Sequence, residues 1–511
     1  ELGQGLHEVQ GAQRNLTADA RPSTKPVRRE VHPGEPLMEG VGLAYAKGRT
    51  VLGMLEAWIG PEAVRRGLLV YMDRHEWGNA SASDIWAALD ETSGRNVSEM
   101  VAGFLEQPGY PLLRIEPLEG GRVRVSQTRF RNAGVEMKEL HWTVPLVLRW
   151  SVAGATRTRA VLLDAESMEV DLGARVPVDW IYPNGGGSGY YRWWAPAGEL
   201  TALAAAASSA LDVVERVELL GNLRALLDSG AIDGATYLRA LAAMKDDPDP
   251  QVLASMAAAV GAVRNTFITP DLEDAFAAWV RATLGPGLRR IGMDPRPGEP
   301  DAASLARPPL LTTLADEGAD TDVRTWAHGQ TEDYLAGASA VQTDLAWTAM
   351  RIAALDADAV LFDRVRERFE AAPNPRERGA MIGVMSSFRR PEIRQEFLRW
   401  AFGSLRSEEF QSAGRTLRQT EEGTDVYFHF LLDRYDVVAT RLTEEFLGFL
   451  PRIAGGCSRE RIETAREFFG DPSRAVAGTE SSLRRAEDAT MDCVRLRERE
   501  GASVAAFLRN L

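Results

Sequence analysis

The spacing of apolar side chains changes twice along this 511-residue chain. From residue 47 to residue 107 and again after residue 198, apolar residues recur every three to four positions, which is typical of helices. Between these stretches they alternate with polar residues, which is typical of half-buried strands. A chain of this length and order does not build a single core, so we expect a multidomain α+β protein that is mostly α.

The first part of the chain is predicted to begin irregularly and then to form four helices. Residues 1–40 are rich in proline and glycine and show no sustained period, so they are predicted to be irregular. Helices are predicted from four apolar stripes. These are Val51, Met54, Leu55, Trp58 and Ile59; Val64, Leu68, Leu69 and Met72; Ile85, Trp86 and Leu89; and Val97, Met100, Val101, Phe104 and Leu105.

The middle of the chain is predicted to be a small antiparallel β-sandwich. Leu113, Ile115, Val123 and Val125 alternate with polar residues around a Glu119-Gly120-Gly121 turn, which predicts a hairpin. Further β-rich runs, at 141–150, 157–163, 168–172 and 178–182, favour a sandwich of short strands. From Gly198 to Leu511 the pattern is almost wholly helical and predicts an irregular α-solenoid of the HEAT/ARM kind, with about 16 helices.

The residues themselves form no complete active site. A hydrolytic zinc site usually needs two histidines four positions apart, with a glutamate after the first. His7-Glu8 and His75-Glu76 begin in this way, but Gly11 and Asn79 stand where the second histidine belongs. We therefore predict no metal ligand in this chain.

A serine motif, a glycine run and the two cysteines are further candidates for functional sites, and each also has a structural explanation. Gly187-Ser188-Gly189 lacks the spacing of a hydrolase nucleophile elbow, and Gly185-Gly186-Gly187 is predicted to be a turn rather than a phosphate cradle. Cys457 and Cys493 either form one disulfide or stay free. A structural role is favoured for Cys457 because no histidine lies near it in the sequence.

Charge and hydropathy limit the partners and the location. The net charge of -14 argues against nucleic acid as a partner. No run of about 18 apolar residues is present, so no membrane span is predicted. Glu1 to Arg28 is polar, so no signal peptide is predicted and we expect a soluble chain. Because the chain does not start with methionine, we expect a processed or truncated product, and its compartment stays open.

Several short motifs together resemble zinc aminopeptidases of the aminopeptidase N type, the gluzincin metallopeptidases. Tyr45-Ala46-Lys47-Gly48 resembles their Tyr-Glu-Lys-Gly segment, and Phe104 to Pro111 resembles Trp-x-x-Gln-x-Gly-Tyr-Pro. The match also includes Val51 to Leu55, Ile59-Gly60, Tyr71, Gly78 to Ala80, Asp84 to Leu89, Trp142 to Leu146, Asn184, Gly189, Tyr191, Arg192 and Pro297-Gly298-Glu299. Each motif is short, but they keep the order and spacing of the family.

The resemblance implies three parts. Residues 1–107 would be the C-terminal helical part of a thermolysin-like catalytic domain, 108–190 the β-sandwich domain, and 191–511 the α-helical cap. The family removes N-terminal residues from peptides with a zinc-activated water, a glutamate general base and a tyrosine that donates to the oxyanion. Tyr45 is the residue that matches this tyrosine, and Ala46 departs from the usual acidic residue beside it.

The family's zinc ligands and general base would precede Glu1. The resemblance therefore implies the C-terminal portion of an aminopeptidase, which binds no zinc alone and is inactive when isolated. Its partners would be a peptide substrate and the N-terminal catalytic half that carries the zinc. The alternative is a non-catalytic binding or scaffold protein that uses the concave face of the solenoid.

Overall fold

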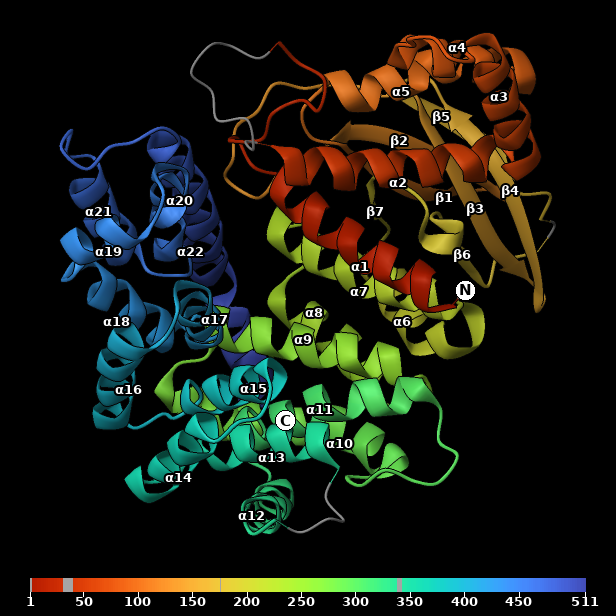
Figure 1. Ribbon diagram of the computed structural model, residues 1–511. Coiled ribbons are helices and arrows are strands. Elements are labelled where there is room, and N and C mark those ends of the chain that lie inside the picture. The colour runs from red at the N-terminus through yellow and green to blue at the C-terminus, as the bar shows by residue number, and fades with distance from the viewer. Residues whose placement is uncertain (1, 31–39, 175, 338–341) are drawn as a thin grey trace. The chain divides into compact units, whose positions relative to one another are not determined.

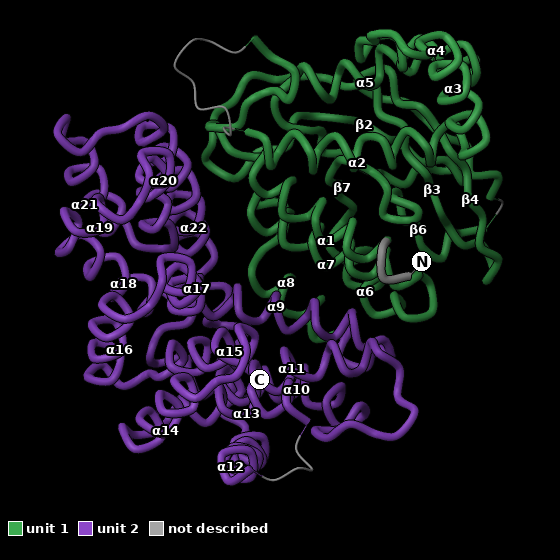
Figure 2. Tube along the Cα trace, viewed as in Figure 1, with its two compact units in different colours: residues 1–243 green, residues 244–511 purple. Residues whose placement is uncertain are grey.

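The computed structural model describes residues 2–30, 40–174, 176–337 and 342–511. Within these ranges the chain is mostly helical with two small sheets, as predicted, and it divides into two compact units, 1–243 and 244–511 (Figures 1 and 2). The division falls inside the segment that the sequence predicts to be one helical domain, so the predicted domain boundaries remain a prediction. No helix among the described residues has the length and apolar character that crossing a bilayer requires.

The first unit contains eight α-helices, one short 3-10 helix (Gly185–Gly187) and seven strands among its described residues. The helices are α1 (Leu2–Asp19), α2 (Val41–Ile59), α3 (Pro61–Arg74), α4 (Ala82–Ser93), α5 (Val97–Glu106), α6 (Ala197–Ala210), α7 (Val213–Ser229) and α8 (Gly234–Ala243). The strands are β1 (Pro111–Leu118), β2 (Arg122–Arg129), β3 (Val144–Val152), β4 (Ala155–Leu163), β5 (Ser167–Asp171), β6 (Trp180–Tyr182) and β7 (Arg192–Trp194).

The prediction that residues 1–40 are irregular was wrong for α1. Leu6, Val9, Ala12 and Leu16 lie on one face of this helix and are buried. They are spaced by three or four residues, so the helical period was present but weak beside glycines and polar residues. The helix ends at Asp19, before the prolines begin, and residues 31–39 lie outside the described ranges.

The strands form two sheets, with orders β5-β2-β1-β7 and β4-β3-β6. The predicted hairpin pairs β1 with β2 antiparallel, with Ile115 opposite Val125, and the inward residues of both strands are buried. One departure from an antiparallel sandwich is β7, which pairs parallel with β1. This three-residue strand was not predicted because its tryptophans show no alternation with polar residues.

The second unit is helical throughout its described residues. Its α-helices are α9 (Pro250–Phe267), α10 (Glu273–Ile291), α11 (Asp301–Asp316), α12 (Thr321–Leu335), α13 (Thr343–Ala353), α14 (Ala359–Glu370), α15 (Pro375–Met385), α16 (Pro391–Ser404), α17 (Ser407–Leu417), α18 (Glu421–Leu432), α19 (Tyr435–Arg441), α20 (Glu444–Phe449), α21 (Arg459–Phe469) and α22 (Thr479–Arg509). Consecutive helices pack on each other, for example α12 on α13 and α14 on α15, as in a solenoid.

The last helix of this unit returns to the first. α22 packs against α9 and α10, which lie more than two hundred residues earlier in the chain. Arg497 Nε donates to the carbonyl oxygen of Thr266 at 2.7 Å, and Arg509 pairs with Asp271 at 2.6 Å. The described helices of this unit therefore do not form an open-ended stack.

The two cysteines form a disulfide. Cys457 and Cys493 lie with their Cα atoms 5.2 Å apart and are 36 residues apart in sequence. The bond joins the segment before α21 to the middle of α22. It therefore resolves the open question of their pairing and gives Cys457 a structural role.

Candidate functional site

A fully buried ion pair holds α2, the helix that carries Tyr45. Lys47 Nζ lies 2.9 Å from Asp19 Oδ2, and both side chains have no exposed surface. Lys47 also donates to the carbonyl oxygen of Gly109 at 2.8 Å. Burial lowers the pKa of Lys47, and the charge of Asp19 opposes that change. Because a buried ammonium is costly without partners, these contacts are what allow α2 to sit against α1.

The same pair joins three of the motifs that carry the resemblance. Asp19 Oδ1 accepts a hydrogen bond from Gly109 N at 3.1 Å, and Asp19 Oδ2 accepts one from the Tyr190 hydroxyl at 3.1 Å. The ring of Tyr190 packs edge-on against Tyr110, with centroids 5.7 Å apart. The segments around Lys47, Gly109 and Tyr190 are distant in sequence but meet at one carboxylate. Their short motifs therefore share a packing role.

Tyr45 lies on a different face of α2 from this pair. Its side chain is 78% exposed, so the ring is open to the surroundings rather than enclosed. No hydrogen bond to its hydroxyl is formed within the described part of the chain. The phenol is thus a free donor on a firmly anchored helix, and its predicted role as an oxyanion donor stays a prediction.

The neighbourhood of Tyr45 in sequence carries an unusual amount of exposed apolar surface. Six large apolar side chains between residues 45 and 77 are exposed, and Trp77 is 98% exposed. They are Tyr45, Leu52, Leu68, Leu69, Met72 and Trp77. The second apolar stripe predicted from sequence therefore does form a helix, α3, but most of the stripe faces outward. The residues of α3 that are buried are the small Ala63 and Gly67. These side chains lie on α2, on α3 and in the turn after α3.

The described residues do not supply a zinc site. No group of three or more histidine, cysteine, aspartate or glutamate side chains in the described ranges is arranged to hold a metal ion. His328 pairs with Asp356 at 3.1 Å, and His141 lies 3.7 Å from Glu166, both at exposed positions. Catalytic zinc needs three protein ligands, so we assign no step through zinc to this chain.

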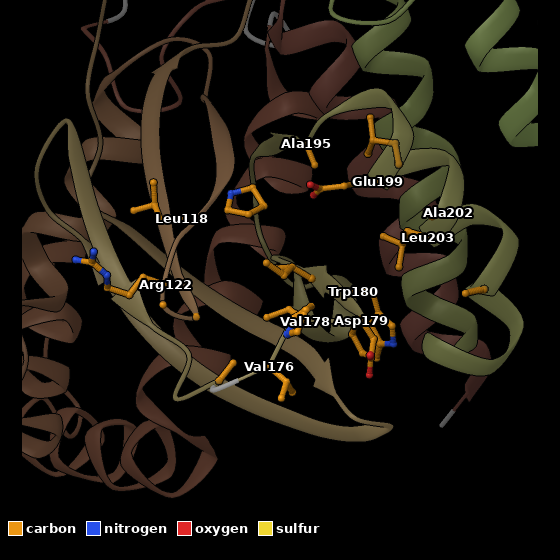
Figure 3. Close-up of a pocket in the computed structure, with 18 of the residues that line it drawn as sticks. Leu118, Arg122, Val176, Val178, Asp179, Trp180, Ala195, Glu199, Ala202 and Leu203 are labelled. Carbon is orange, nitrogen blue, oxygen red and sulfur yellow. The ribbon is translucent and has the colours of Figure 1, made fainter.

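A cavity of about 830 Å³ lies elsewhere in the first unit (Figure 3). It is lined by the turn between β1 and β2, by residues 176–181 and by α6. Its Arg122 pairs with Glu169 at 2.8 Å, and its Asp179 accepts a hydrogen bond from Ser151 Oγ at 2.8 Å. Tyr45 does not line it, and no nucleophile stands beside a base among the described residues that do, so we assign it no chemistry.

The Pro297-Gly298-Glu299 motif has a structural role in the second unit. Glu299 Oε1 accepts a hydrogen bond from Arg307 Nη1 at 2.9 Å and one from Ser304 Oγ at 2.8 Å. Arg307 is buried and also donates from Nε to the carbonyl oxygen of Gly292 at 3.0 Å. The hydrogen bonds from Arg307 lower the pKa of Glu299 to about 2. The motif thus ties the loop after α10 to α11.

Replacing Glu299 with glutamine should destabilise the second unit at pH 7 by about 1–2 kcal/mol. Glutamine has nearly the same shape as glutamate, so the packing around Arg307 is kept, but Arg307 loses the negative charge that faces it. The native pKa lies below the value near 4.5 of an ordinary glutamate, so the ionised form stabilises the fold above about pH 4.5. That contribution is lost as the pH falls towards 2. Urea unfolding of both proteins at pH 7 and pH 3 measures the difference, which should shrink at the lower pH. An equal difference at both pH values would contradict the assignment.

Comparison with known proteins places these features in a family. Residues 180–491 match the ERAP1-like C-terminal domain, and residues 4–104 match the Peptidase family M1 domain. The chain belongs to the M1 aminopeptidase family, of the aminopeptidase N type. The resemblance inferred from the motifs is therefore confirmed.

Individual relatives of the family cover different shares of the chain. Aminopeptidase 2 of Candida albicans is 22% identical over 97% of this chain and 54% of its own length. Aminopeptidase N of Lactococcus lactis is 28% identical over 61% of the chain and 37% of its own length. Puromycin-sensitive aminopeptidase of Caenorhabditis elegans is 30% identical over 45% of the chain and 25% of its own length. The chain thus covers between a quarter and about half of the length of these family members.

Sequence reasoning missed the residues that anchor the candidate site. Lys47 was part of a recognised motif, but its buried partner Asp19 fell in the stretch predicted to be irregular. The available signal was the spacing of Leu6, Val9 and Leu16, which predicts a helix that ends near Asp19. A lysine in the middle of an apolar helix was a second signal, since such a residue needs a buried acidic partner.

Proposed function

We propose that this chain is the C-terminal part of a zinc-dependent aminopeptidase, with Tyr45 as the donor that stabilises the oxyanion. The parts would be 1–107, 108–190 and 191–511, as the resemblance implies. The observation that carries the proposal is the exposed phenol of Tyr45 on a helix anchored by the buried Lys47–Asp19 pair. Membership of the M1 family supports the reaction class, the hydrolysis of N-terminal residues from peptides.

Within the proposal, the tyrosine hydroxyl acts as a neutral hydrogen-bond donor. Attack of water on the scissile carbonyl places negative charge on the carbonyl oxygen, and an O–H group aimed at that oxygen stabilises the charge. Because α2 is fixed by contacts on its buried face, the donor needs little reorganisation during the reaction. The metal and the general base would come from polypeptide outside the described residues.

The exposed apolar residues of α2, of α3 and of the turn after α3 are a second observation in support of the proposal. We propose that the polypeptide carrying the zinc ligands packs on the surface formed by Leu52, Leu68, Leu69, Met72 and Trp77. Full burial of a side chain of this size contributes about 1.5–3 kcal/mol, and these partly exposed side chains would contribute part of that before the costs of association. The same contact would bring zinc-bearing residues towards the helix that carries Tyr45.

The isolated 511-residue chain should bind no zinc tightly and should release no product from aminoacyl anilides. Co-expression with the polypeptide encoded upstream should give a complex with one zinc per chain and hydrolysis that a chelator abolishes. Elemental analysis and a chromogenic assay measure both quantities. An upstream polypeptide without His-Glu-x-x-His, or a zinc-free and inactive complex, would leave the binding or scaffold function as the better interpretation.

A further inference from the structure

A cavity in the second unit is lined mostly by apolar side chains, and the charged side chains that line it are all arginines. Its volume is about 350 Å³, and it is lined by residues of α16, α17, α18, α19 and α20 and of the short turn at 450–454. The interior consists of aromatic and aliphatic side chains, among them Leu405, Tyr427, Leu431, Val438 and Ile453, all buried. This size and composition are those of a site for a small ligand.

Four arginines line the same cavity, namely Arg415, Arg418, Arg441 and Arg452. No aspartate or glutamate is among the described residues that line it, although the chain as a whole carries a charge of -14. The four arginines are exposed and give the lining a positive charge, which favours an anionic ligand over a cationic one. The cavity is therefore complementary to a ligand with an apolar body and a negative end.

Contacts with lining residues place the guanidinium groups at the wall. Arg441 lies over the ring of Phe402, with its Cζ atom 4.4 Å from the centroid, and Arg452 lies over the ring of Phe449 at 4.5 Å. Arg415 and Arg418 lie close enough to Tyr427 for their charges to lower its pKa against the larger effect of burial, which raises it to about 12. Each of these three aromatic residues lines the cavity itself.

Three of the four arginines are available to a ligand. Within the described part of the chain, none of Arg415, Arg418 and Arg441 forms an ion pair with a carboxylate. Arg418 Nε donates to the carbonyl oxygen of Gly414 at 3.3 Å, and Arg441 donates to the carbonyl oxygen of Phe402 at 2.5 Å. These bonds fix the side chains but leave their charge uncompensated. A carboxylate would gain charge-assisted hydrogen bonds from them.

From this arrangement we infer that the cavity binds a small amphipathic carboxylate, in which an aliphatic or aromatic group enters the apolar interior and the carboxylate pairs with Arg415 and Arg418. A free aliphatic acid and the C-terminal residue of a peptide both have this chemistry. An amine of the same shape is excluded by the four guanidinium groups.

Calorimetric titration of the full 511-residue chain at pH 7.5 tests the inference. Decanoate should bind one per chain, decanol should bind at least tenfold more weakly, and decyltrimethylammonium should not bind. The same titration with an N-acetylated peptide that ends in leucine, and with its C-terminal amide, shows whether the ligand is the C-terminus of a peptide or a free aliphatic acid. Binding of either acid in preference to its uncharged counterpart supports the site.

Two substitutions locate the binding. The double substitution Arg415→Gln and Arg418→Gln should lower the affinity for the preferred acid about a hundredfold, which is about tenfold for each lost charge-assisted contact. Arg399→Gln, an exposed arginine on α16 that does not line the cavity, should leave the affinity unchanged. Circular dichroism checks that all variants fold. The inference is overturned if neither acid binds, if the uncharged analogues bind equally well, or if the double variant binds like the original chain.

Discussion

Replacing Tyr45 with phenylalanine is expected to lower kcat of the assembled enzyme proposed above by about 10²–10³, with little change in KM. The substitution removes one donor to the oxyanion and nothing else, and the loss of such a donor typically has an effect of this size. The free energy of unfolding should not change, because the ring is 78% exposed and its hydroxyl has no hydrogen-bond partner among the described residues. Steady-state hydrolysis of leucine anilide and urea unfolding measure the two effects.

A second tyrosine supplies the matched control. Tyr71 lies on α3 and packs near His75, with ring centroids 5.4 Å apart. Tyr71→Phe removes the same atom from the neighbouring helix and should leave kcat within about twofold, because this hydroxyl has no proposed part in the reaction. If Tyr45→Phe keeps a third or more of the original kcat, the proposed role of Tyr45 is wrong.

Replacing Lys47 with methionine is expected to lower the free energy of unfolding of the first unit by about 3–5 kcal/mol. The change leaves Asp19 charged and buried without its cation, and breaking a buried pair from one side has a cost of this order. Three neutral donors remain on Asp19, from Gly109, Thr24 and Tyr190, and these do not replace a charge. Urea unfolding followed by circular dichroism measures the loss.

Two further variants separate the charge from the packing. Adding Asp19→Asn to Lys47→Met removes the stranded charge and should recover about 1–2 kcal/mol, a coupling that a double-mutant cycle reports. Arg65→Met breaks the exposed pair between Arg65 and Glu62 and should leave the free energy of unfolding unchanged within the error of the measurement. Equal losses for Lys47→Met and Arg65→Met would show that the buried pair has no special role.

The order of helical and strand segments could be predicted because most elements carry a clear period. The stripe from Val51 to Trp58 and the alternation around Ile115 and Val125 both face a core, as the structure shows. The prediction of buried faces was wrong where a periodic apolar stripe is not covered by other parts of the chain. Leu68 and Met72 have the spacing of a buried stripe but are exposed, since periodicity reports amphipathicity and not what covers the apolar face.

Long-range partners could not be predicted from spacing. Asp19 and Lys47 lie 28 residues apart, and Gly109 and Tyr190 lie further along the chain. Each of these residues has an ordinary local role, as a helix end, a helix interior or a turn, and the buried cluster exists only in the folded unit. The four arginines that line the cavity in the second unit are similar, because they come from different helices and a turn.

The return of α22 to α9 also has a consequence for synthesis on the ribosome. Contacts between residues this far apart in sequence can form only after the last helix has left the exit tunnel, and each must first overcome the entropy of closing a long loop. Helices that pack on their neighbours in sequence can fold earlier, whereas the surface of α9 and α10 that α22 covers stays exposed until α22 is made. Newly made second units should thus expose that apolar surface, and need protection from aggregation, until α22 has emerged from the ribosome.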